Sequence, residues 1–259
     1  MAGRKSAVAG SSQTGPLAAR RRGVEPEGIQ PCSRCPVAAS CLPGSVPEGQ
    51  LALVESMVTQ QRVLRAGTAL FRAGEEFSSL FAVRSGCLKS TVIDVDGREH
   101  ILNFHLPGEV LGFASIYQRR HAGNAIALAT STVCYLSFSE VLRLSQQFPE
   151  LILGLLRIAS RSALYTGRLT GDHNAVVRVA AFLLSLSGRL RAQGRQSAEF
   201  SLVMSREDIA NHLRLAPETV SRVLTQLRRE GVISARGKAV RLLDEERLQG
   251  LAGPMLPYG

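Results

Sequence analysis

Three of the chain's five cysteines lie within ten positions, in the stretch CSRCPVAASC at residues 32 to 41. Grouped thiols of this kind bind metals or carry out redox chemistry when their compartment keeps them reduced. Five cysteines in 259 residues are too sparse, and odd in number, for the disulfide framework of a small secreted domain. The cysteine group therefore predicts a metal site or a redox site.

The N-terminal stretch shows no export signal, because Arg4, Lys5 and the arginines at 20 to 22 interrupt it and no apolar run follows. No part of the chain approaches the roughly twenty apolar residues that a membrane span requires. We therefore expect a cytoplasmic protein without a membrane partner, whose thiols stay reduced.

Positive charge is concentrated in two parts of the chain, which has a net charge of +10 and a pI near 10.1. Residues 174 to 243 hold twelve Lys and Arg against five Asp and Glu, and the first 24 residues add five basic residues and no acidic one. A basic domain suggests an anionic partner, with nucleic acid ahead of membrane. The length and the 45% hydrophobic content suit two domains of modest size.

The periodicity of apolar residues changes twice along the N-terminal half of the sequence. Residues 1 to 30 show no periodicity and predict a disordered basic tail, and the cysteine segment follows at 31 to 47. Leu51, Val54 and Val58 then recur at helical intervals and predict a short helix over 48 to 60. Beyond it, short apolar runs predict an all-β roll that completes a sensor domain over 48 to 147. Glycines separate these runs at intervals of 7 to 12, namely Gly67, Gly74, Gly86, Gly97 and Gly108. The Asp96-Gly97 pair favours a hairpin tip.

From about residue 137 the period becomes helical, and Pro149 suits the first turn of a long helix over 148 to 173. Its apolar band is wide enough to need two neighbours, one of which would be the same helix in a second copy of the chain. Burial within one chain is the alternative. The stripe that predicts the dimer contact is Leu151, Leu155, Ile158, Ser162, Tyr165 and Leu169.

Residues 174 to 245 carry the pattern of a winged helix-turn-helix, with a C-terminal tail at 246 to 259. Ser205 and Asp208 form a capping-box pattern that opens one helix, and Pro217 is a first-turn residue for a second helix. Gly231 ends that second helix, and a two-stranded wing follows with Arg236-Gly237 at its tip. The second helix of such a motif enters the major groove of DNA.

The exposed side of the second helix offers base-reading groups. Arg222 can donate two hydrogen bonds to guanine, Glu218 can accept from amino groups of bases, and Ser221 can contact either edge; Thr219 lies beside them. Contacts with phosphates are predicted for six other basic residues of the motif, because such contacts supply affinity without sequence information. These are Arg206, Arg214, Arg228, Arg229, Arg236 and Lys238.

The glycine-punctuated roll, the long helix and the winged helix with ETVSR resemble the CRP/FNR family of bacterial transcription regulators over roughly residues 48 to 245. The resemblance implies an α+β fold. Its parts are a cyclic-nucleotide-binding-like jelly roll, a dimerisation helix and a winged helix-turn-helix. It also implies a homodimer on double-stranded palindromic DNA. The roll hairpin would contact RNA polymerase through Ile93, Asp94, Gly97 and Arg98.

The spacing Cys32-x2-Cys35-x5-Cys41, together with Cys134, is similar to the FNR branch, whose members hold an oxygen-labile [4Fe–4S] cluster with four thiolates. This branch implies oxygen-responsive control of anaerobic metabolism, by activation or repression, at TTGAT-like half-sites. A cubane with four irons takes four thiolates. Zinc also takes four, although usually from two Cys-x-x-Cys pairs, and it remains an alternative together with a bare thiol switch. Cys87 reads as a small core residue.

Two other functions remain as alternatives. A CRP-like regulator would sense a small ligand in the roll, and a cyclic nucleotide would need an arginine beside a small hydroxyl residue to bind its phosphate. Asn124-Ala125 occupy the corresponding place, and Arg119 and Arg120 belong to the preceding loop. A redox enzyme would need an acid–base constellation, and the histidines, His100, His105, His121, His173 and His212, are scattered.

Overall fold

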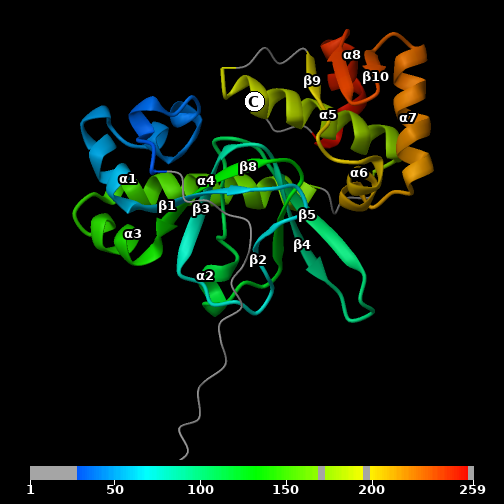
Figure 1. The fold of residues 1–259 in the computed structure, drawn as a ribbon. Coiled ribbons are helices and arrows are strands. Elements are labelled where there is room, and N and C mark those ends of the chain that lie inside the picture. Colours follow the sequence, from blue (N-terminus) through cyan, green and yellow to red (C-terminus); the bar gives the residue numbers. More distant parts are fainter. Residues whose placement is uncertain (1–27, 169–172, 195–198, 256–259) are drawn as a thin grey trace, which may run out of the picture.

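The computed structural model describes residues 28–168, 173–194 and 199–255, which form a β-roll, a long helix and a C-terminal domain of helices and short strands (Figure 1). This architecture confirms the α+β prediction with an N-terminal roll and a C-terminal winged helix-turn-helix. The predicted basic tail lies, as far as residue 27, outside the described residues. None of the described helices is long and apolar enough to cross a membrane.

Two antiparallel sheets of four strands form the roll, with strand orders β1-β8-β3-β6 and β2-β7-β4-β5. The strands are β1 (Val58–Leu64), β2 (Ala69–Phe71), β3 (Ser79–Ser85), β4 (Leu88–Ile93), β5 (Glu99–His105), β6 (Val110–Leu111), β7 (Asn124–Ala127) and β8 (Ser131–Ser137). Gly97 has a φ of +79° in the predicted hairpin tip between β4 and β5, where its N–H donates to the Asp94 carbonyl at 3.0 Å. Glycine adopts this left-handed conformation without steric cost.

Strand β8 is buried on both faces, because it lies between two different cores. Val133 and Tyr135 face the interior of the roll, where Val133 is fully buried. Cys134 and Leu136 alternate with them and point outward, into a second apolar cluster under the N-terminal segment. The period of two along a strand therefore directs the Cys134 thiol away from the roll interior.

The N-terminal segment covers the outer face of this sheet as a series of 3-10 turns, Cys32–Arg34, Ala38–Ser40, Leu42–Ser45 and Glu48–Gln50, followed by α1 (Leu51–Met57). The predicted helix over 48 to 60 is too long, because β1 begins at Val58. Val58 pairs with Leu136 of β8 and is 8% exposed. Pairing with the sheet overrides the local helical period at this point.

Three further helices accompany the roll, α2 (Ser115–Gln118), α3 (Phe138–Ser145) and the long α4 (Pro149–Arg168), which begins at Pro149 as predicted. Leu151 and Leu155 of α4 are each 3% exposed and pack in the same cluster as Cys134 and Val141 of α3. These two leucines are therefore covered by their own chain, and the dimer contact assigned to them stays a prediction. The N-terminal segment and α3 cover the side of α4 on which they lie.

The apolar residues of α4 that reach solvent lie on its opposite side. Leu153, Leu156 and Leu164 are 49%, 57% and 61% exposed. Ile158 and Ser162 of the predicted stripe are half-buried, the side chain of Tyr165 is not described, and Leu169 lies outside the described residues. The helix thus has two apolar faces, as its wide band predicted, and the open one is centred near Leu156.

The C-terminal domain contains the two predicted motif helices and the wing. Its elements are α5 (Ala175–Arg191), β9 (Glu199–Ser201), α6 (Arg206–Leu213), α7 (Pro217–Arg229), β10 (Ile233–Arg236), β11 (Ala239–Leu242) and α8 (Glu245–Ala252), with a last turn at Gly253–Met255. The prediction of a tail after residue 245 needs correction, because Leu248 and Ala252 of α8 are fully buried and Met255 is 6% exposed. This segment belongs to the domain core.

One apolar cluster joins the roll to the C-terminal domain. Phe104 of β5 packs edge-on against Phe182 of α5 and His212 of α6, with ring centroids 6.1 and 5.0 Å away. Arg189 of α5 donates to both carboxylate oxygens of Glu109, each at 2.7 Å, and to the Phe104 carbonyl.

Polar contacts along β5 and α6 reinforce the same interface. Asn211 accepts from the Ile101 N–H and donates to the Glu99 carbonyl, both at 2.7 Å, and so replaces a neighbouring strand. The Lys89 ammonium lies 3.1 Å from both Glu99 and Asp208. The two domains are therefore held together by directed bonds as well as by apolar packing.

Acid is expected to loosen this interface. Burial lowers the pKa of His105 and of His212 to about 4, so both stay neutral in the fold, whereas an unfolded histidine has a pKa near 6.5. The unfolded state then binds more protons, and stability is lost as pH falls from about 6.5 to 4, by on the order of 3 kcal/mol for each histidine. Urea unfolding at several pH values measures this slope. A His212→Gln variant should show a weaker slope, and equal stability of the parent protein at pH 7 and pH 4.5 would contradict the prediction.

Candidate metal centre and DNA-binding surface

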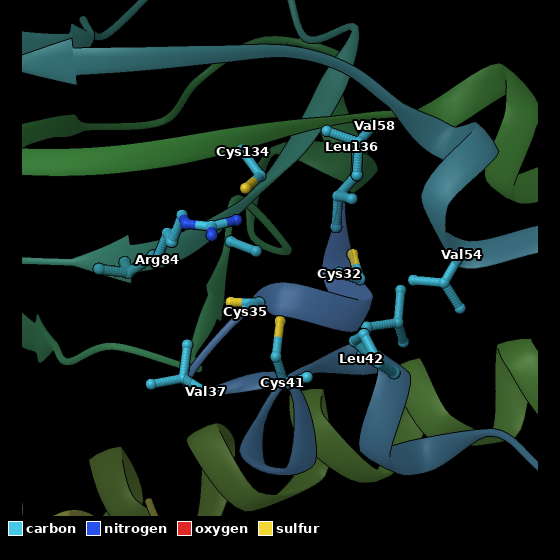
Figure 2. A pocket seen from close by; sticks show the side chains of 14 residues that line it. Cys32, Cys35, Val37, Cys41, Leu42, Val54, Val58, Arg84, Cys134 and Leu136 are labelled. Carbon is cyan, nitrogen blue, oxygen red and sulfur yellow. The ribbon is translucent and has the colours of Figure 1, made fainter. Parts of the chain in front are cut away.

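Four cysteines line one small pocket between the N-terminal segment and β8. They are Cys32, Cys35 and Cys41 of the segment and Cys134 of the strand. Figure 2 shows their sulfur atoms directed toward the space between these elements, with apolar side chains such as Leu42, Val54 and Leu136 around it. The fold therefore brings a residue 93 positions beyond Cys41 to the same pocket.

Local packing determines how the segment presents its thiols. The Cys35 N–H donates to the Cys32 carbonyl at 2.9 Å, which closes the first turn. Leu42 is fully buried and anchors the segment next to Cys41. A Cβ at position 44 would lie 1.9 Å from the Ala39 carbonyl oxygen, so only glycine allows this close approach of two backbones.

The thiols of Cys32, Cys41 and Cys134 are protonated at neutral pH when no metal is bound. Burial raises the pKa of Cys32 and of Cys134 to about 11, and that of Cys41 to about 12. Nucleophilic or redox-switch cysteines need a lowered pKa, so these three are poor candidates for a bare thiol switch. Metal binding would displace their protons.

Four cysteine thiols are a donor set that a four-iron cluster or a zinc ion could use. No group of three or more His, Cys, Asp or Glu side chains is arranged to hold a metal ion among the described residues. Zinc needs all four sulfurs at about 2.3 Å from one point, whereas in a cubane each thiolate binds a different iron. The cavity volume is only about 20 Å³, room for about one water molecule, so the segment must move outward to admit a cluster.

Polar residues missed in the sequence surround the pocket. Arg84 of β3 lines it, and Gln61 of β1 lies directly opposite Cys134 in the pairing of β1 with β8. Arg84 opposes the effect of burial by lowering the pKa values of Cys32 and Cys134. No sequence motif marks these two residues, because each is one polar residue in an alternating strand.

The second motif helix, α7, presents the predicted base-reading groups to solvent. Val220, Val223, Leu224 and Leu227 are buried, while Glu218, Ser221 and Arg222 are exposed and Thr219 is half-buried. Arg222 makes no hydrogen bond or ion pair within the described part of the chain. Its guanidinium is thus available to a ligand.

The groups predicted to meet phosphate fall into two sets. Arg228, Arg229, Arg236 and Lys238 are exposed. Arg206 donates to the Gly237 carbonyl of the wing tip at 3.4 Å, and its other terminal nitrogen is buried without a partner.

Arg214 makes an additional contact, with the roll, while its predicted phosphate contact stays a prediction. It lies at the C-terminal end of α6 with a φ of +56°, and it donates to the ring of His100 in β5. Arg214 therefore contributes to the domain interface.

Comparisons with known proteins agree with both halves of the fold. Residues 177–251 match the Crp-like helix-turn-helix domain, and residues 61–148 match the cyclic nucleotide-binding domain. The chain is 41% identical over 232 residues to the transcriptional activator protein anr of Pseudomonas aeruginosa, which covers 87% of this chain and 93% of the relative. The chain belongs to the CRP/FNR family of transcriptional regulators.

Other members of the CRP/FNR family extend this agreement. The fumarate and nitrate reduction regulatory protein of Yersinia pestis is 36% identical over 235 residues, 87% of this chain and 92% of the relative. The solved structure of FixK2 from Bradyrhizobium japonicum superposes with a TM-score of 0.68 at 28% identity, over 74% of this chain and 96% of that chain. As a CRP/FNR regulator, the chain is a DNA-binding protein and not an enzyme.

Aromatic side chains pack against one another inside the roll of this CRP/FNR member. Phe71 stacks on His121 with ring centroids 3.7 Å apart, and Phe81 packs against Phe71 and Tyr135. Ala125 is fully buried, and Asn124 accepts from the Ala73 N–H at 3.0 Å. The side-chain oxygen of Asn124 is thus already engaged within the roll.

Replacing Arg222 with alanine tests the base-reading role of α7. We expect Arg222→Ala to lose about 1 to 3 kcal/mol of binding free energy on the specific site and to relax base preference at one position. Fluorescence anisotropy with specific and scrambled duplexes measures both. Arg228→Ala is the matched control, because a phosphate contact weakens binding to the two duplexes equally. An equal loss for Arg222→Ala would make Arg222 a phosphate contact.

Proposed function

We propose that this CRP/FNR protein is an oxygen-responsive transcription regulator that holds a [4Fe–4S] cluster with Cys32, Cys35, Cys41 and Cys134. The observation that carries the proposal is the shared pocket of these four thiols. The names of relatives that refer to fumarate and nitrate reduction support a role in anaerobic metabolism, exercised in the cytoplasm by activation or repression.

The chain's own residues would convert cluster binding into order. When bound, the cluster would supply an oxygen-labile link among the four thiolates. Three of these thiolates belong to a segment of short turns, and such a link would hold that segment more firmly on the sheet. Ser40, next to Cys41, donates to the Ala192 carbonyl at the end of α5, at 2.6 Å. A shift of the segment would therefore change a direct contact with the DNA-binding domain.

The active species would be a homodimer on a palindromic, TTGAT-like site. We assign the dimer contact to the open face of α4, with Leu153, Leu156 and Leu164 at its centre. Two α7 helices would then occupy successive major grooves about one DNA turn apart. An equilibrium of this kind needs only a few kcal/mol of difference between states to switch.

The roll hairpin remains our candidate for the contact with RNA polymerase, through Ile93, Asp94, Gly97 and Arg98. Ile93 is 62% exposed, which suits a contact surface. The Asp94 carboxylate instead shapes the turn, because it accepts from the Asp96 and Arg98 N–H groups at 2.9 Å and lies 2.7 Å from His100.

A charge on the open face of α4 should separate the dimer. Leu156→Glu places like charges opposite each other across the proposed interface, and we expect a monomer at concentrations where the parent protein is a dimer. Sedimentation velocity of the anaerobic proteins measures this. Leu142→Glu is the control, because Leu142 is 43% exposed on α3 and lies outside the proposed contact. A dimeric Leu156→Glu protein would move the contact elsewhere.

The function as a whole is tested by the visible spectrum and iron content of protein purified without oxygen and then exposed to air. We expect a brown band near 400 nm that bleaches in air, about four irons per chain, and specific DNA binding that disappears with the band. A colourless protein with zinc or without metal would instead favour a regulator that senses a ligand in the roll.

A further inference from the structure

We propose that Arg84 is a positioning residue of the cluster site, whose guanidinium balances the negative charge of the thiolate-held cluster and ties down the start of the cysteine segment. This inference rests on the proposed function, because it assigns a role to Arg84 only when a cluster is bound. No cysteine motif or DNA-binding motif includes Arg84.

The strand pairing directs Arg84 toward the pocket. In β3, Ala82 lies opposite Cys134 and Val83 opposite Val133, but the register then shifts, so that the next partners are Ser85 and Thr132. The irregularity leaves Arg84 as an extra residue in the pair, a feature that sheets use to re-aim a side chain. Figure 2 shows the guanidinium reaching in beside Cys134.

Hydrogen bonds hold the guanidinium in this position. Arg84 donates to the Gln30 side-chain oxygen at 2.9 Å and to the Gln30 carbonyl at 3.3 Å. Gln30 is also held by Gln61, through bonds of 2.8 and 3.1 Å. Gln61 is 5% exposed and lies directly opposite Cys134 in the pairing of β1 with β8. Arg84, Gln30 and Gln61 thus connect the fourth cysteine to the residue that precedes the other three.

No carboxylate among the described residues neutralises the positive charge of Arg84. Arg84 forms no ion pair among the residues that the structure describes. The carboxylate next to the segment, Glu55, accepts from the Ser33 N–H at 3.0 Å. A cubane held by four thiolates is an anion, and nearby charge and hydrogen bonds set its potential. A fixed cation at the pocket would stabilise the cluster most in its reduced, more negative state.

The test compares the reduction potential of the cluster in four proteins, each purified and measured without oxygen. They are the parent chain, Arg84→Gln, Arg84→Lys and Arg62→Gln. Arg62 is the matched control, because it lies on neighbouring β1 and donates to the Tyr135 hydroxyl at 2.9 Å, outside the residues that line the pocket.

We expect Arg84→Gln to lower the equilibrium constant for reduction of the cluster about tenfold. For one electron this is a negative shift of about 59 mV in the reduction potential. Arg84→Lys should restore most of the potential because it keeps the charge, and Arg62→Gln should match the parent. A potential unchanged in Arg84→Gln overturns the proposal. So does an Arg84→Lys potential that does not differ from that of Arg84→Gln. If Arg84→Gln does not assemble a cluster, the test rests on Arg84→Lys. A parent-like potential of Arg84→Lys supports the proposal, and failure of Arg84→Lys to assemble a cluster overturns it. A parent chain without iron would overturn the proposed function itself.

Discussion

Replacing Cys134 with alanine should abolish anaerobic DNA binding while the fold survives. Cys134 is the only ligand candidate that belongs to the sheet, so its loss leaves the segment's three thiols without a link to the roll. The side chain is 8% exposed, and truncating so small a group costs about 1 kcal/mol. Circular dichroism should therefore match the parent, while iron content and specific binding to the palindrome fall together.

Cys87→Ala is the matched control for this experiment. Cys87 is fully buried, as predicted, but it lies immediately before β4 and belongs to the core that joins the roll to the DNA-binding domain. Cys87→Ala also removes one buried sulfur atom, but this atom lies outside the pocket. We expect it to keep iron and DNA binding. A Cys134→Ala protein that still bound DNA tightly without oxygen would remove Cys134 from the site.

Loss of the Glu109 carboxylate should destabilise the protein by about 3 kcal/mol. Glu109 and Arg189 have side chains only 19% exposed, and breaking a mostly buried ion pair leaves one charge in a poorly solvated place. Burial by itself raises the pKa of Glu109, but the charge and hydrogen bonds of Arg189 outweigh it, and the pKa is lowered overall. The carboxylate is therefore ionised at neutral pH, and Glu109→Ala removes its full charge.

Urea unfolding at pH 7 measures this loss, with Glu140→Ala as the control. Glu140 pairs with Arg143 at 2.7 Å on α3, where the two side chains are 36% and 53% exposed, and such surface pairs contribute at most about 1 kcal/mol. We expect a large effect at Glu109 and almost none at Glu140. Equal effects would mean that the Glu109–Arg189 bridge does not stabilise the domain interface.

The acid sensitivity of the interface and the Glu109 bridge share one cause. His105, Glu109 and Arg189 lie where α5 meets the end of β5, and each must keep a particular charge state there. The contact between the DNA-binding domain and the roll thus depends on the protonation states of these groups, in addition to the packing of the Phe104 and Phe182 rings. Variants of this interface should be compared at a single pH.

Much of this protein follows from local patterns in its sequence. The capping box of Ser205 and Asp208 forms as predicted, with the Ser205 hydroxyl accepting from the Asp208 N–H at 2.9 Å and the carboxylate accepting from the Ser205 N–H. Pro217 begins α7, and Gly237 lies at the wing tip with a φ of +59°. These features depend on residues a few positions apart, so a short stretch contains all the information they need.

Other features depend on pairings that no short stretch contains. Helix α1 ends early because Val58 pairs with β8, and α4 turns Leu151 and Leu155 inward because the cysteine segment covers that side. Arg214 bonds to His100, 114 positions away. In each case a partner distant in sequence decides between two conformations or two faces that the local pattern leaves equally open.

The sequence by itself determined that this chain is a basic, two-domain, winged-helix protein with a cysteine group in front of a roll. Only the tertiary structure decided that Cys134 faces that group and that Arg84 and Gln61 border the pocket. The reason is register: a strand alternates its side chains between two faces, and the pairing of β1, β8 and β3 decides which face meets the N-terminal segment. A shift of one residue in that pairing would turn the Cys134 thiol into the roll.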